Sequence, residues 1–500
     1  MILRPQFSDF KVIGFYLSKL VIGVALFMVL PMAVAFLAKE LNPLYDFFIS
    51  FLACLILGSI LYIVCYTKEE ARWSHGMVVV SLAWALAAIL GALPLFLSGH
   101  FNSFLDAVFE AMSGFTTSGL TLAQDLGHMS YAHNFWRHLM MFLGGQGIVV
   151  IVLAYFVRGA TGAFRLYVGE GRDERLLPDI RQTARFIWMV SAVYLVLGTL
   201  TLGIILFFEG MPFLKSIFHG VCIFMTGFDT GGFAPQQQNV MYYHSLAFEI
   251  GTLMVMLLGA INFKLHYVLW TGNRKEIWRN IETRTLFFAI MFAFVLVALG
   301  LSKMHVYPTA LALFRKGFYH LISAQTGTGF QVVYSDQFVN EWNGLSLAGL
   351  ILAMSLGGCI CSTTGAIKML RIGIITKTFI SDVKRHISPA LTVLIEKMHH
   401  IKDSILTDAQ MRSACLVTIA YIVVYVTGAV IGMLYGYPFV ESLFESTSAA
   451  ANVGLSCGIT NPGMPDGLKI VYIVQMWAGR LEFMSVFVLI GFVVALIKGK

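Results

Sequence analysis

This chain has few charged residues. Asp, Glu, Lys and Arg make up 12% of its 500 residues, about half of the roughly 25% that is usual in soluble globular proteins. Hydrophobic residues make up 58%. So apolar a chain cannot give a set of soluble domains a hydrated surface. The composition therefore excludes the multi-domain soluble protein that the length alone suggests, and it indicates a protein of the lipid bilayer.

Cysteine is rare as well. The seven cysteines are scattered and odd in number, so no disulfide framework is expected. Cys359 and Cys361 are separated by a single residue, which is not the spacing of a zinc pair. The net charge of +7 does not indicate a nucleic-acid partner, because basic residues gather in the cytoplasmic loops of membrane proteins.

Signatures of other membrane functions are missing too. The sequence contains no HExxH string, which argues against an intramembrane enzyme of the metalloprotease kind. An ion-coupled carrier of organic solutes is the other alternative. It predicts inverted halves and paired intramembrane carboxylates, whereas the apolar stretches of this chain hold few acidic residues.

What the chain does have is long apolar stretches. A spanning helix takes about 20 apolar residues, and ten stretches qualify. They cover residues 12–38, 45–66, 76–98, 139–157, 186–208, 246–271, 285–302, 346–367, 413–435 and 470–497. Of the 34 Lys and Arg residues, 24 fall in segments that ten spans place on one side. The positive-inside rule then predicts a multi-pass protein with cytoplasmic N- and C-termini.

The four long connections on the other side share a pattern. Each begins with an amphipathic run that is too short to span the bilayer, and each ends in a glycine followed by Leu or Phe. These glycines are Gly119, Gly232, Gly329 and Gly454. In the second connection Gly231 competes with Gly232, which we prefer because an apolar residue follows it. A cluster of small residues follows each glycine by 25 to 28 positions.

This repetition predicts an all-α polytopic membrane protein with ten transmembrane helices and four re-entrant pore helices. Four parallel helix–pore-helix–helix repeats would surround a pseudo-fourfold pore, beside an N-terminal helix pair. The helix pair covers residues 1–66, and the repeats cover 76–157, 186–271, 285–380 and 413–500.

Such a repeat is suited to an ion pathway. Non-helical backbone at membrane depth is tolerated only inside protein or beside water. Four such strands on one axis would offer rings of carbonyl oxygens, which replace the hydration shell of a monovalent cation. A lone glycine could instead serve only close helix packing, but four matched glycines favour a filter. The predicted ligands are the backbone carbonyls of Thr116, Thr117, Ser118, Gly119, Thr230, Gly231, Gly232, Phe233, Thr326, Gly327, Thr328, Gly329, Asn452, Val453 and Gly454.

Four strings carry a resemblance to a known family. They are Phe109–Thr121, Thr230–Phe233, Gly357–Lys368 and Ala478–Glu482. On these strings the chain resembles the TrkH/TrkG–KtrB–HKT superfamily of potassium transporters over nearly its whole length. The resemblance implies potassium uptake across the bacterial cytoplasmic (inner) membrane, with K⁺ held by the filter carbonyls and no covalent cofactor. It also implies a homodimer and a cytosolic TrkA-like regulatory subunit, which alone would bind a nucleotide.

Two gating elements are predicted. Small and hydroxyl residues in the middle of the eighth span weaken a helix there, and the resemblance implies an intramembrane gating loop. Its residues are Gly357, Gly358, Cys359, Ser362, Thr363, Thr364 and Gly365. The second element is Arg480, because an intramembrane arginine normally faces a cavity or a carboxylate. The resemblance implies a position in the pore below the filter. A structural ion pair with Glu482, Glu445 or Glu110 is the alternative.

Selectivity and two further charges stay open at this stage. Superfamily members with Ser at the first filter position tend to admit sodium, so Gly119 predicts preference for potassium; a sodium-permeable member is the alternative. Asp229 departs from the family pattern. It either concentrates cations at the outer mouth or accepts hydrogen bonds from filter amides. Lys264 is able to snorkel inward from its span.

Overall fold

The computed structural model describes residues 5–69, 71–147, 180–304, 307–389 and 396–499. In this part the chain is almost entirely helical, as predicted. One antiparallel hairpin joins β1 (Lys397–His400) to β2 (Lys402–Ile405), with Lys397 opposite Ile405. Residues 148–157 of the fourth predicted span lie outside the described residues.

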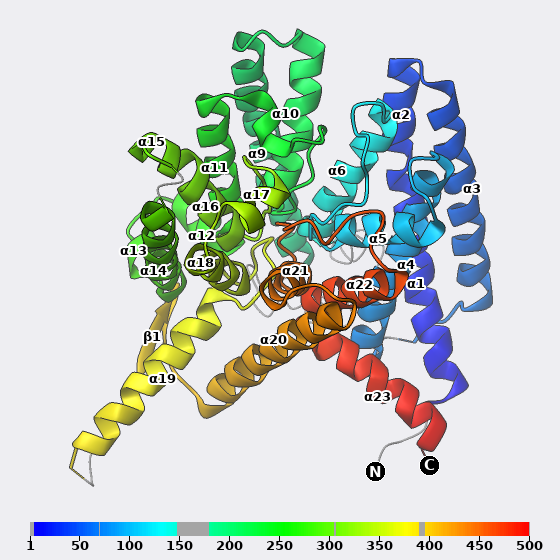
Figure 1. Cartoon of the computed structure of the whole chain (residues 1–500). Helices are drawn as coiled ribbons and strands as arrows, with labels where there is room; N and C mark the ends of the chain where they lie inside the picture. Colours follow the sequence, from blue (N-terminus) through cyan, green and yellow to red (C-terminus); the bar gives the residue numbers. More distant parts are fainter. Residues whose placement is uncertain (1–4, 70, 148–179, 305–306, 390–395, 500) are drawn as a thin grey trace.

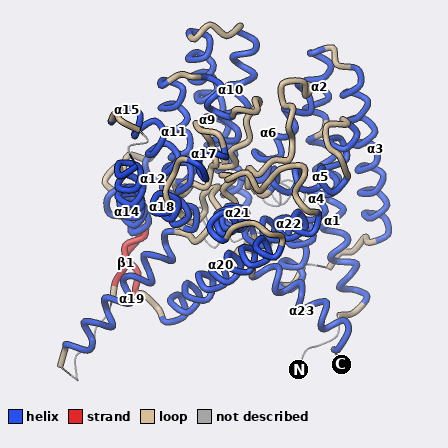
Figure 2. Tube along the Cα trace, viewed as in Figure 1, coloured by secondary structure: helices blue, strands red, loops and turns tan. Residues whose placement is uncertain are grey.

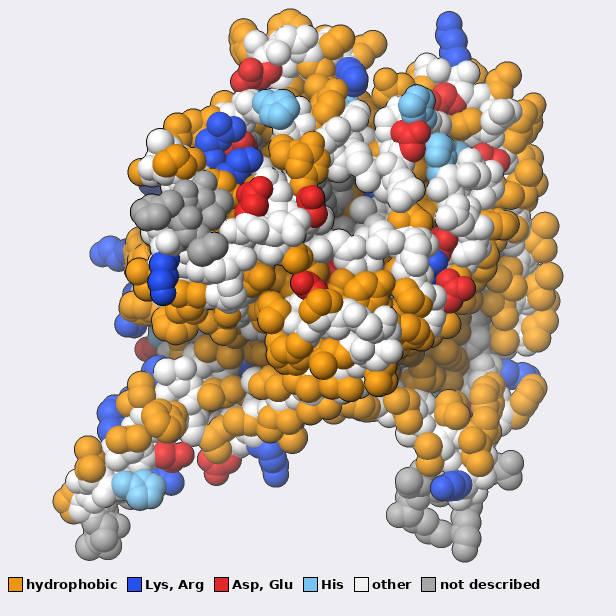
Figure 3. Space-filling view, in the orientation of Figure 1, with side chains coloured by type: hydrophobic (Ala, Val, Ile, Leu, Met, Phe, Trp, Pro, Cys, Tyr) orange, Lys and Arg blue, Asp and Glu red, His pale blue; other side chains and the backbone are white. Residues whose placement is uncertain are grey.

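Six described helical segments are long and apolar enough to cross a membrane, or up to eight if two bent pairs are each one span. The six are α1 (Phe7–Phe27) with α2 (Val29–Ala38), α3 (Leu41–Val64), α4 (Trp73–Leu97), α9 (Ile180–Phe208), α14 (Ile281–Met304) and α20 (Asp408–Leu434). Hydrophobic side chains cover the middle of the face in Figure 3, and charged ones gather mainly toward its two ends.

The four amphipathic runs form short helices. Three are regular: α5 (Phe104–Phe115), α10 (Phe213–Phe228) and α21 (Phe439–Ala451). The third repeat instead builds its short helix from α15 (Ala310–Leu313), a π turn η2 (Phe314–Phe318) and α16 (Tyr319–Gln325). Side-chain caps fix where two of them begin, since Ser103 accepts a hydrogen bond from the amide of Asp106 and Thr309 accepts one from Ala312.

A second helix follows each short one. These helices are α6 (Tyr131–Gln146), α11 (Leu246–Ala260), α18 (Gly344–Ser355) and α22 (Asp466–Arg480). The sequence predicts continuous spans over 246–271 and 470–497, and the structure breaks both, whereas a non-helical loop within 346–367 is predicted. The chain bends by 102° between α11 and α12 (Phe263–Trp270), and by 110° between α22 and α23 (Met484–Lys498). Residues 356–368 are non-helical between α18 and α19 (Met369–Ile387).

The remaining elements are short, at η1 (Asn239–Tyr243), α13 (Glu276–Arg279) and α17 (Ser335–Asn340). Both termini and the hairpin lie at the same end of the molecule (Figure 1), whereas loops and turns run through its centre (Figure 2). The centre is therefore where the short helices end and non-helical backbone collects.

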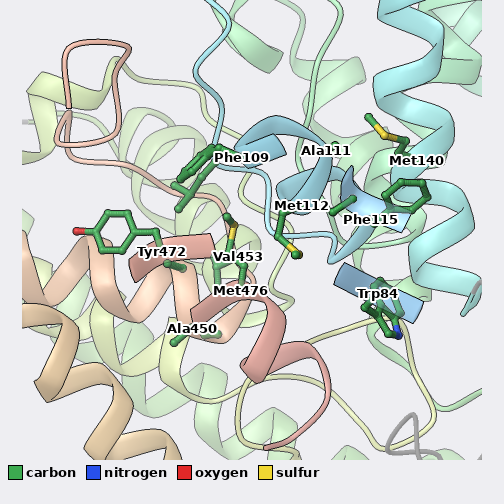
Figure 4. Close-up of a cluster of buried hydrophobic side chains, with 14 of the residues drawn as sticks. Trp84, Phe109, Ala111, Met112, Phe115, Met140, Ala450, Val453, Tyr472 and Met476 are labelled. Carbon is green, nitrogen blue, oxygen red and sulfur yellow. The ribbon is translucent and has the colours of Figure 1, made fainter. Parts of the chain in front are cut away.

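A large apolar core holds the first short helix in place. α5 packs against α4, α6 and α22. In Figure 4 the ring of Phe115 lies next to the side chain of Met140, above Trp84. Phe115 and Trp84 are fully buried. Gly91 of α4 leaves the room for Phe115, because a Cβ atom there would lie 2.6 Å from that ring. Close van der Waals packing of such side chains holds the frame together.

Candidate functional site

Each short helix ends in the interior and leads into a strand with a repeated backbone conformation. Two residues of every strand have positive φ, the left-handed region that favours glycine. The first are Thr117 (55°), Thr230 (52°), Gly327 (68°) and Asn452 (56°). The second, two positions later, are Gly119 (82°), Gly232 (75°), Gly329 (81°) and Gly454 (94°). The backbone therefore aligns Gly232, and not Gly231, with the other three predicted filter glycines.

The four strands form a closed ring. A Cβ atom on Gly119 would lie 2.3 Å from the carbonyl oxygen of Gly231. A Cβ atom on Gly232 would likewise lie 2.1 Å from the carbonyl oxygen of Thr328, and one on Gly329 would lie 2.1 Å from that of Val453. A Cβ atom on Gly454 would lie 2.5 Å from the carbonyl oxygen of Ser118. Every glycine thus faces the carbonyl of the next strand, and the fourth strand returns to the first. We refer to residues 116–119, 230–233, 326–329 and 452–454 as the filter strands.

The carbonyl oxygens of this ring are available as ligands, because no hydrogen-bond donor in the described part of the chain is paired with them. Within the described residues, no hydrogen bond is made to the carbonyl oxygens of Ser118, Gly231, Thr328 and Val453. Buried carbonyls are normally paired. The short helices also end at the strands, so the negative ends of four helix dipoles point toward the ring. Unpaired carbonyls and negative dipole ends together suit a cation that has lost its water.

The second helices press against the ends of the short helices. A Cβ atom on Gly144 would lie 1.7 Å from the carbonyl oxygen of Phe115, and one on Gly479 would lie 1.9 Å from that of Ala450. Gly259 makes the same approach in the second repeat. The third repeat differs, because Gln325 occupies the equivalent place and donates to the carbonyls of Leu356 and Gly357. This side chain takes up carbonyls that the break after α18 exposes.

The predicted gating loop is non-helical and docks on the other repeats. Thr363 is fully buried, and its hydroxyl donates to the carbonyls of Phe228 and Gly259 at 3.0 Å each. The same hydroxyl lies 3.2 Å from that of Thr230 in the second filter strand. On the other side, a Cβ atom on Gly365 would lie 2.3 Å from the carbonyl oxygen of Ala451. The loop therefore lies against the ring, between the second and fourth repeats.

Arg480 ties this loop to the filter. Its Nη1 donates to the carbonyl of Thr363 at 2.7 Å and to the hydroxyl of Thr117 at 3.2 Å. Its Nη2 donates to the carbonyl of Gly144 at 2.7 Å. The guanidinium also lies 5.5 Å from the ring centre of Trp84. One side chain thus joins the loop, the first filter strand and the end of α6.

The carboxylates considered as partners of Arg480 also form contacts with other residues. Glu110 forms a fully buried ion pair with Arg137 at 2.7 Å, and Glu482 pairs with Arg371. Glu445 accepts hydrogen bonds from other groups of its own repeat. The contacts of Arg480 described above go to two backbone carbonyls and a hydroxyl.

Comparison with known proteins places this geometry in a family. Residues 44–495 match the TrkH family, which is described as cation transport proteins. The chain belongs to the TrkH family. It is therefore a multi-pass transporter and not an enzyme. An uncharacterized cation transporter of Methanocaldococcus jannaschii is 30% identical over 98% of this chain and 97% of its own length.

Other TrkH-family relatives cover most of the chain. The Trk system potassium uptake protein TrkG of Escherichia coli is 28% identical over 93% of this chain and 94% of its own length. The crystal structure of the potassium transporter TrkH from Vibrio parahaemolyticus superposes with a TM-score of 0.81 at 24% identity. It covers 96% of this chain and 98% of that one, and the likeness establishes a shared fold.

Hydroxyl residues behind the filter of this TrkH-family chain were not identified from the sequence. Six positions before each filter glycine stands a Ser or Thr, namely Ser113, Thr226, Ser323 and Ser448. In every repeat, the carbonyl of this residue accepts a hydrogen bond from the amide that precedes the filter glycine, at 2.7 to 2.9 Å. The repeated hydroxyl was the available signal, because it is present in all four strings.

The hydroxyls of two of these residues also orient the strands. Thr226 donates to the carbonyl of Phe233 at 2.8 Å, and Ser323 donates to that of Phe330 at 2.8 Å. In the fourth repeat, the hydroxyl of Ser448 accepts from the amide of Gly454. In the second and third strands, these bonds hold the carbonyl after the glycine on the helix side.

We expect Ser323→Ala to weaken this support. The carbonyl of Phe330 would stay buried without its donor, at a cost of about 1–3 kcal/mol in the free energy of unfolding. Thermal unfolding of the purified protein measures this change. Ser388→Ala is the control, because Ser388 donates only within α19 at an exposed position and its removal should cost less than about 0.5 kcal/mol. Equal losses for the two variants would contradict the proposed support.

Polar side chains nine positions before the filter glycine anchor the strand that follows it. Glu110 accepts from the hydroxyl of Thr121 and the amide of Leu122. His320 lies 3.1 Å from the amide of Val332, and Glu445 lies 2.7 Å from that of Thr460. The second repeat has Ile223 there and uses Asn239 instead, which donates to the carbonyl of Gly232 at 3.0 Å.

Asp229 does not lie at the outer mouth, which is one of the two positions considered for it. It is fully buried at the C-terminal end of α10, and Gln146 of α6 donates to it at 2.8 Å. A Cβ atom on Gly145 would lie 2.4 Å from that of Asp229. A side chain packed into α6 in this way does not stand at an open outer mouth. Lys264 is half-buried in α12, beyond the bend.

Glu282, at the start of α14, contacts both the hairpin and the loop 356–368. This buried carboxylate accepts from the amide of Ile360 at 2.7 Å and lies 3.7 Å from Nδ1 of His400. The neighbouring His399 contacts Asp403 at 2.6 Å and Glu276 at 3.0 Å. Histidine–carboxylate contacts thus attach the hairpin next to Glu282, whose carboxylate accepts a hydrogen bond from the loop.

We expect the attachment of the hairpin to depend on pH. Hydrogen bonds that the ring of His399 donates to the carboxylates of Asp403 and, second, of Glu276 raise the pKa of His399. A raised pKa in the folded state stabilises the hairpin fully below the ordinary value near about pH 6.5, and this stabilisation is lost as the pH rises through the raised pKa. Hydrogen exchange of residues 397–405, corrected for the intrinsic rate, should therefore become faster as the pH rises through the raised pKa of His399.

The His399→Gln variant should lose most of this dependence. His386→Gln is its control, because the ring of His386 is exposed and bonds only to a carbonyl of its own helix. A pH response that persists in His399→Gln would rule out this histidine as its source.

Proposed function

We propose that this TrkH-family protein takes up potassium through the ring of filter strands. The observation that carries the proposal is the closed set of contacts in which each filter glycine faces the carbonyl of the next strand. Only a small, dehydrated cation matches such a ring of oxygens. The name of a relative, the Trk system potassium uptake protein TrkG, supports potassium as the cargo.

The proposed architecture has ten transmembrane helices and four re-entrant pore helices, in the cytoplasmic membrane of a bacterium. Both termini face the cytoplasm in this arrangement. Two observations support it. Of 34 basic residues, 24 fall in segments assigned to the inner side, and both termini lie at the end of the molecule that carries the hairpin (Figure 1).

Residues 356–368 and Arg480 are the proposed gate. The loop lies against the second filter strand through Thr363, and Arg480 joins it to the first. A positive charge in this place opposes the entry of cations, and movement of the loop removes the obstruction and breaks the contact between Thr363 and Arg480. A homodimer and a cytosolic TrkA-like regulatory subunit complete the proposal. The subunit is the only component that would bind a nucleotide.

The test is isotope flux in proteoliposomes that contain the full chain. Under the same imposed gradient, potassium should enter at least about tenfold faster than sodium, as a carbonyl filter requires. Equal rates for the two ions would identify a sodium-permeable member of the superfamily. No flux of either ion through folded, inserted protein would overturn the pore itself.

A further inference from the structure

A cavity of about 590 Å³ opens between α14 and α19, next to the hairpin. It is separate from the filter strands and from Arg480. Its lining combines two chemistries. The lining includes Arg279, Arg284 and Lys377, and apolar side chains such as Phe288 of α14 and Ile372 of α19 stand nearer the loop. Figure 1 shows α19 running down past the hairpin below α14.

The lining of the cavity is basic, since its described residues include no Asp or Glu. Outside the lining, Asp403 interacts electrostatically with Arg279. Lys377 donates to the carbonyl of Lys397 at 2.6 Å. The nearby carboxylates of Glu276 and Asp403 contact His399 at the rim. Asp403 offsets part of the charge of Arg279, but with Arg284 and Lys377 the lining remains net positive and favours an anionic ligand.

The apolar side of the cavity points to the kind of anion. Phe288 is 64% exposed, on a helix that is long and apolar enough to cross a membrane. Large apolar side chains so exposed are covered by acyl chains in a membrane protein. A free phosphate would leave this wall unused. An amphiphile with an anionic head and a hydrocarbon tail matches both parts of the lining.

The cavity also touches the gate. Leu356, where α18 ends and the intramembrane loop begins, lies in its wall. Gly373 of α19 lies in the same wall, and a Cβ atom there would lie 2.9 Å from Ile281 of α14. A ligand between α14 and α19 therefore contacts the first residue of the loop and the helix that follows the loop.

We propose that this cavity binds an anionic phospholipid of the cytoplasmic leaflet. Its phosphate lies among Arg279, Arg284 and Lys377, and one acyl chain lies along Phe288 and Ile372. The bound lipid braces α19 against α14 and so holds the start of the gating loop. The choice of leaflet rests on the orientation proposed above. Binding of the lipid itself does not depend on which ion the pore carries.

Native mass spectrometry of the purified full-length protein tests the proposal. The detergent-solubilised protein is incubated with phosphatidylglycerol or with phosphatidylcholine, and the lipid retained is measured at increasing lipid concentration. We expect phosphatidylglycerol to be retained at least about tenfold better. The triple variant R279Q/R284Q/K377Q should lose this preference, because each cation contributes about fivefold to the affinity for an anionic headgroup.

Two further variants separate the cavity from general charge. The control R274Q/K275Q/R385Q removes the same charge at exposed positions outside the cavity, and it should retain phosphatidylglycerol within about twofold of the unaltered protein, since none of its residues lines the site. Ala289→Trp fills the cavity without a change of charge. It should displace the lipid while the protein keeps its thermal stability, which shows that the fold is intact.

Three outcomes would overturn the proposal. Equal loss of lipid in the control and the triple variant would indicate surface charge alone. Displacement of the lipid by an equimolar amount of inorganic phosphate would indicate a soluble anion site. A change of oligomeric mass in Ala289→Trp, with lipid retention unaltered, would show that a second copy of the chain covers this face. Ion flux is not part of any of these measurements, so failure here is distinguishable from failure of the proposed potassium pathway.

Discussion

Replacing Gly329 with serine is expected to abolish most of the preference for potassium over sodium. Gly329 has a φ of 81°, a conformation that side chains other than glycine resist. A Cβ atom there would also lie 2.1 Å from the carbonyl oxygen of Val453. The strand and its neighbour must then move apart, and the ring loses its regular spacing. The ratio of potassium to sodium flux should fall roughly tenfold or more, which corresponds to about 1.4 kcal/mol of lost discrimination.

Gly327→Asn is the matched control for this prediction. Gly327 lies two positions earlier in the same strand and also has positive φ, at 68°. Space is available there, because the nearest atom to a Cβ would be the carbonyl oxygen of Asn452 at 3.6 Å. Asn tolerates the left-handed region and already occupies the equivalent position in the fourth repeat. Selectivity of Gly327→Asn should stay within about twofold of the unaltered protein, and a loss as large as that of Gly329→Ser would contradict the ring.

The filter could be predicted from the sequence because it is repeated. Four glycines in matched strings define their own alignment, and the φ values of Gly232 and its three counterparts agree with it. The hydroxyl six positions earlier, as at Ser323, belongs to the same repeat and was open to the same argument. The residue types also predicted a loop in the second span of the third repeat, since this span carries Gly357 and Ser362 where a helix needs better helix formers.

The breaks in the other second helices were not predictable in this way. The stretches around Ile261 and Glu482 are apolar on both sides of the bend. The number of apolar residues therefore predicts a single span in each stretch. The chain nevertheless turns by 102° and 110° there. At the second break, Glu482 and Phe483 both adopt positive φ. Tertiary contacts stabilise these turns, such as the ion pair between Glu482 and Arg371, and such contacts join residues that are distant in the sequence.

The contacts of the loop were also beyond the sequence. Glu282 lies at the start of α14, yet its carboxylate holds the amide of Ile360, 78 residues later. Asp229 meets Gln146 across 83 residues. Neither pair has a spacing that a helix or strand period could reveal. A fold of four repeats brings such residues together only because each repeat contacts its neighbours around one axis.

Arg480→Gln is expected to raise the basal flux of potassium about tenfold. The guanidinium donates to the carbonyls of Thr363 and Gly144 and to the hydroxyl of Thr117. Hydrogen bonds to a charged group contribute about 1.5–3 kcal/mol each, so the loop loses more stabilisation than the 1.4 kcal/mol that changes a rate about tenfold. The positive charge that opposes cations below the filter is removed as well. Flux is measured in proteoliposomes without any cytosolic partner.

Three comparisons make this prediction specific. Arg412→Gln removes an exposed arginine at the start of α20 and should leave the flux unaltered. Arg480→Lys keeps the charge, but an ammonium group does not have the planar fork that lets arginine bridge Thr363 and Gly144 together, so an intermediate flux is expected. The filter strands keep their ring in Arg480→Gln, and its preference for potassium over sodium should therefore persist. A raised flux that has lost ion preference would indicate a disrupted filter, and a flux equal to that of Arg412→Gln would contradict a gating role for Arg480.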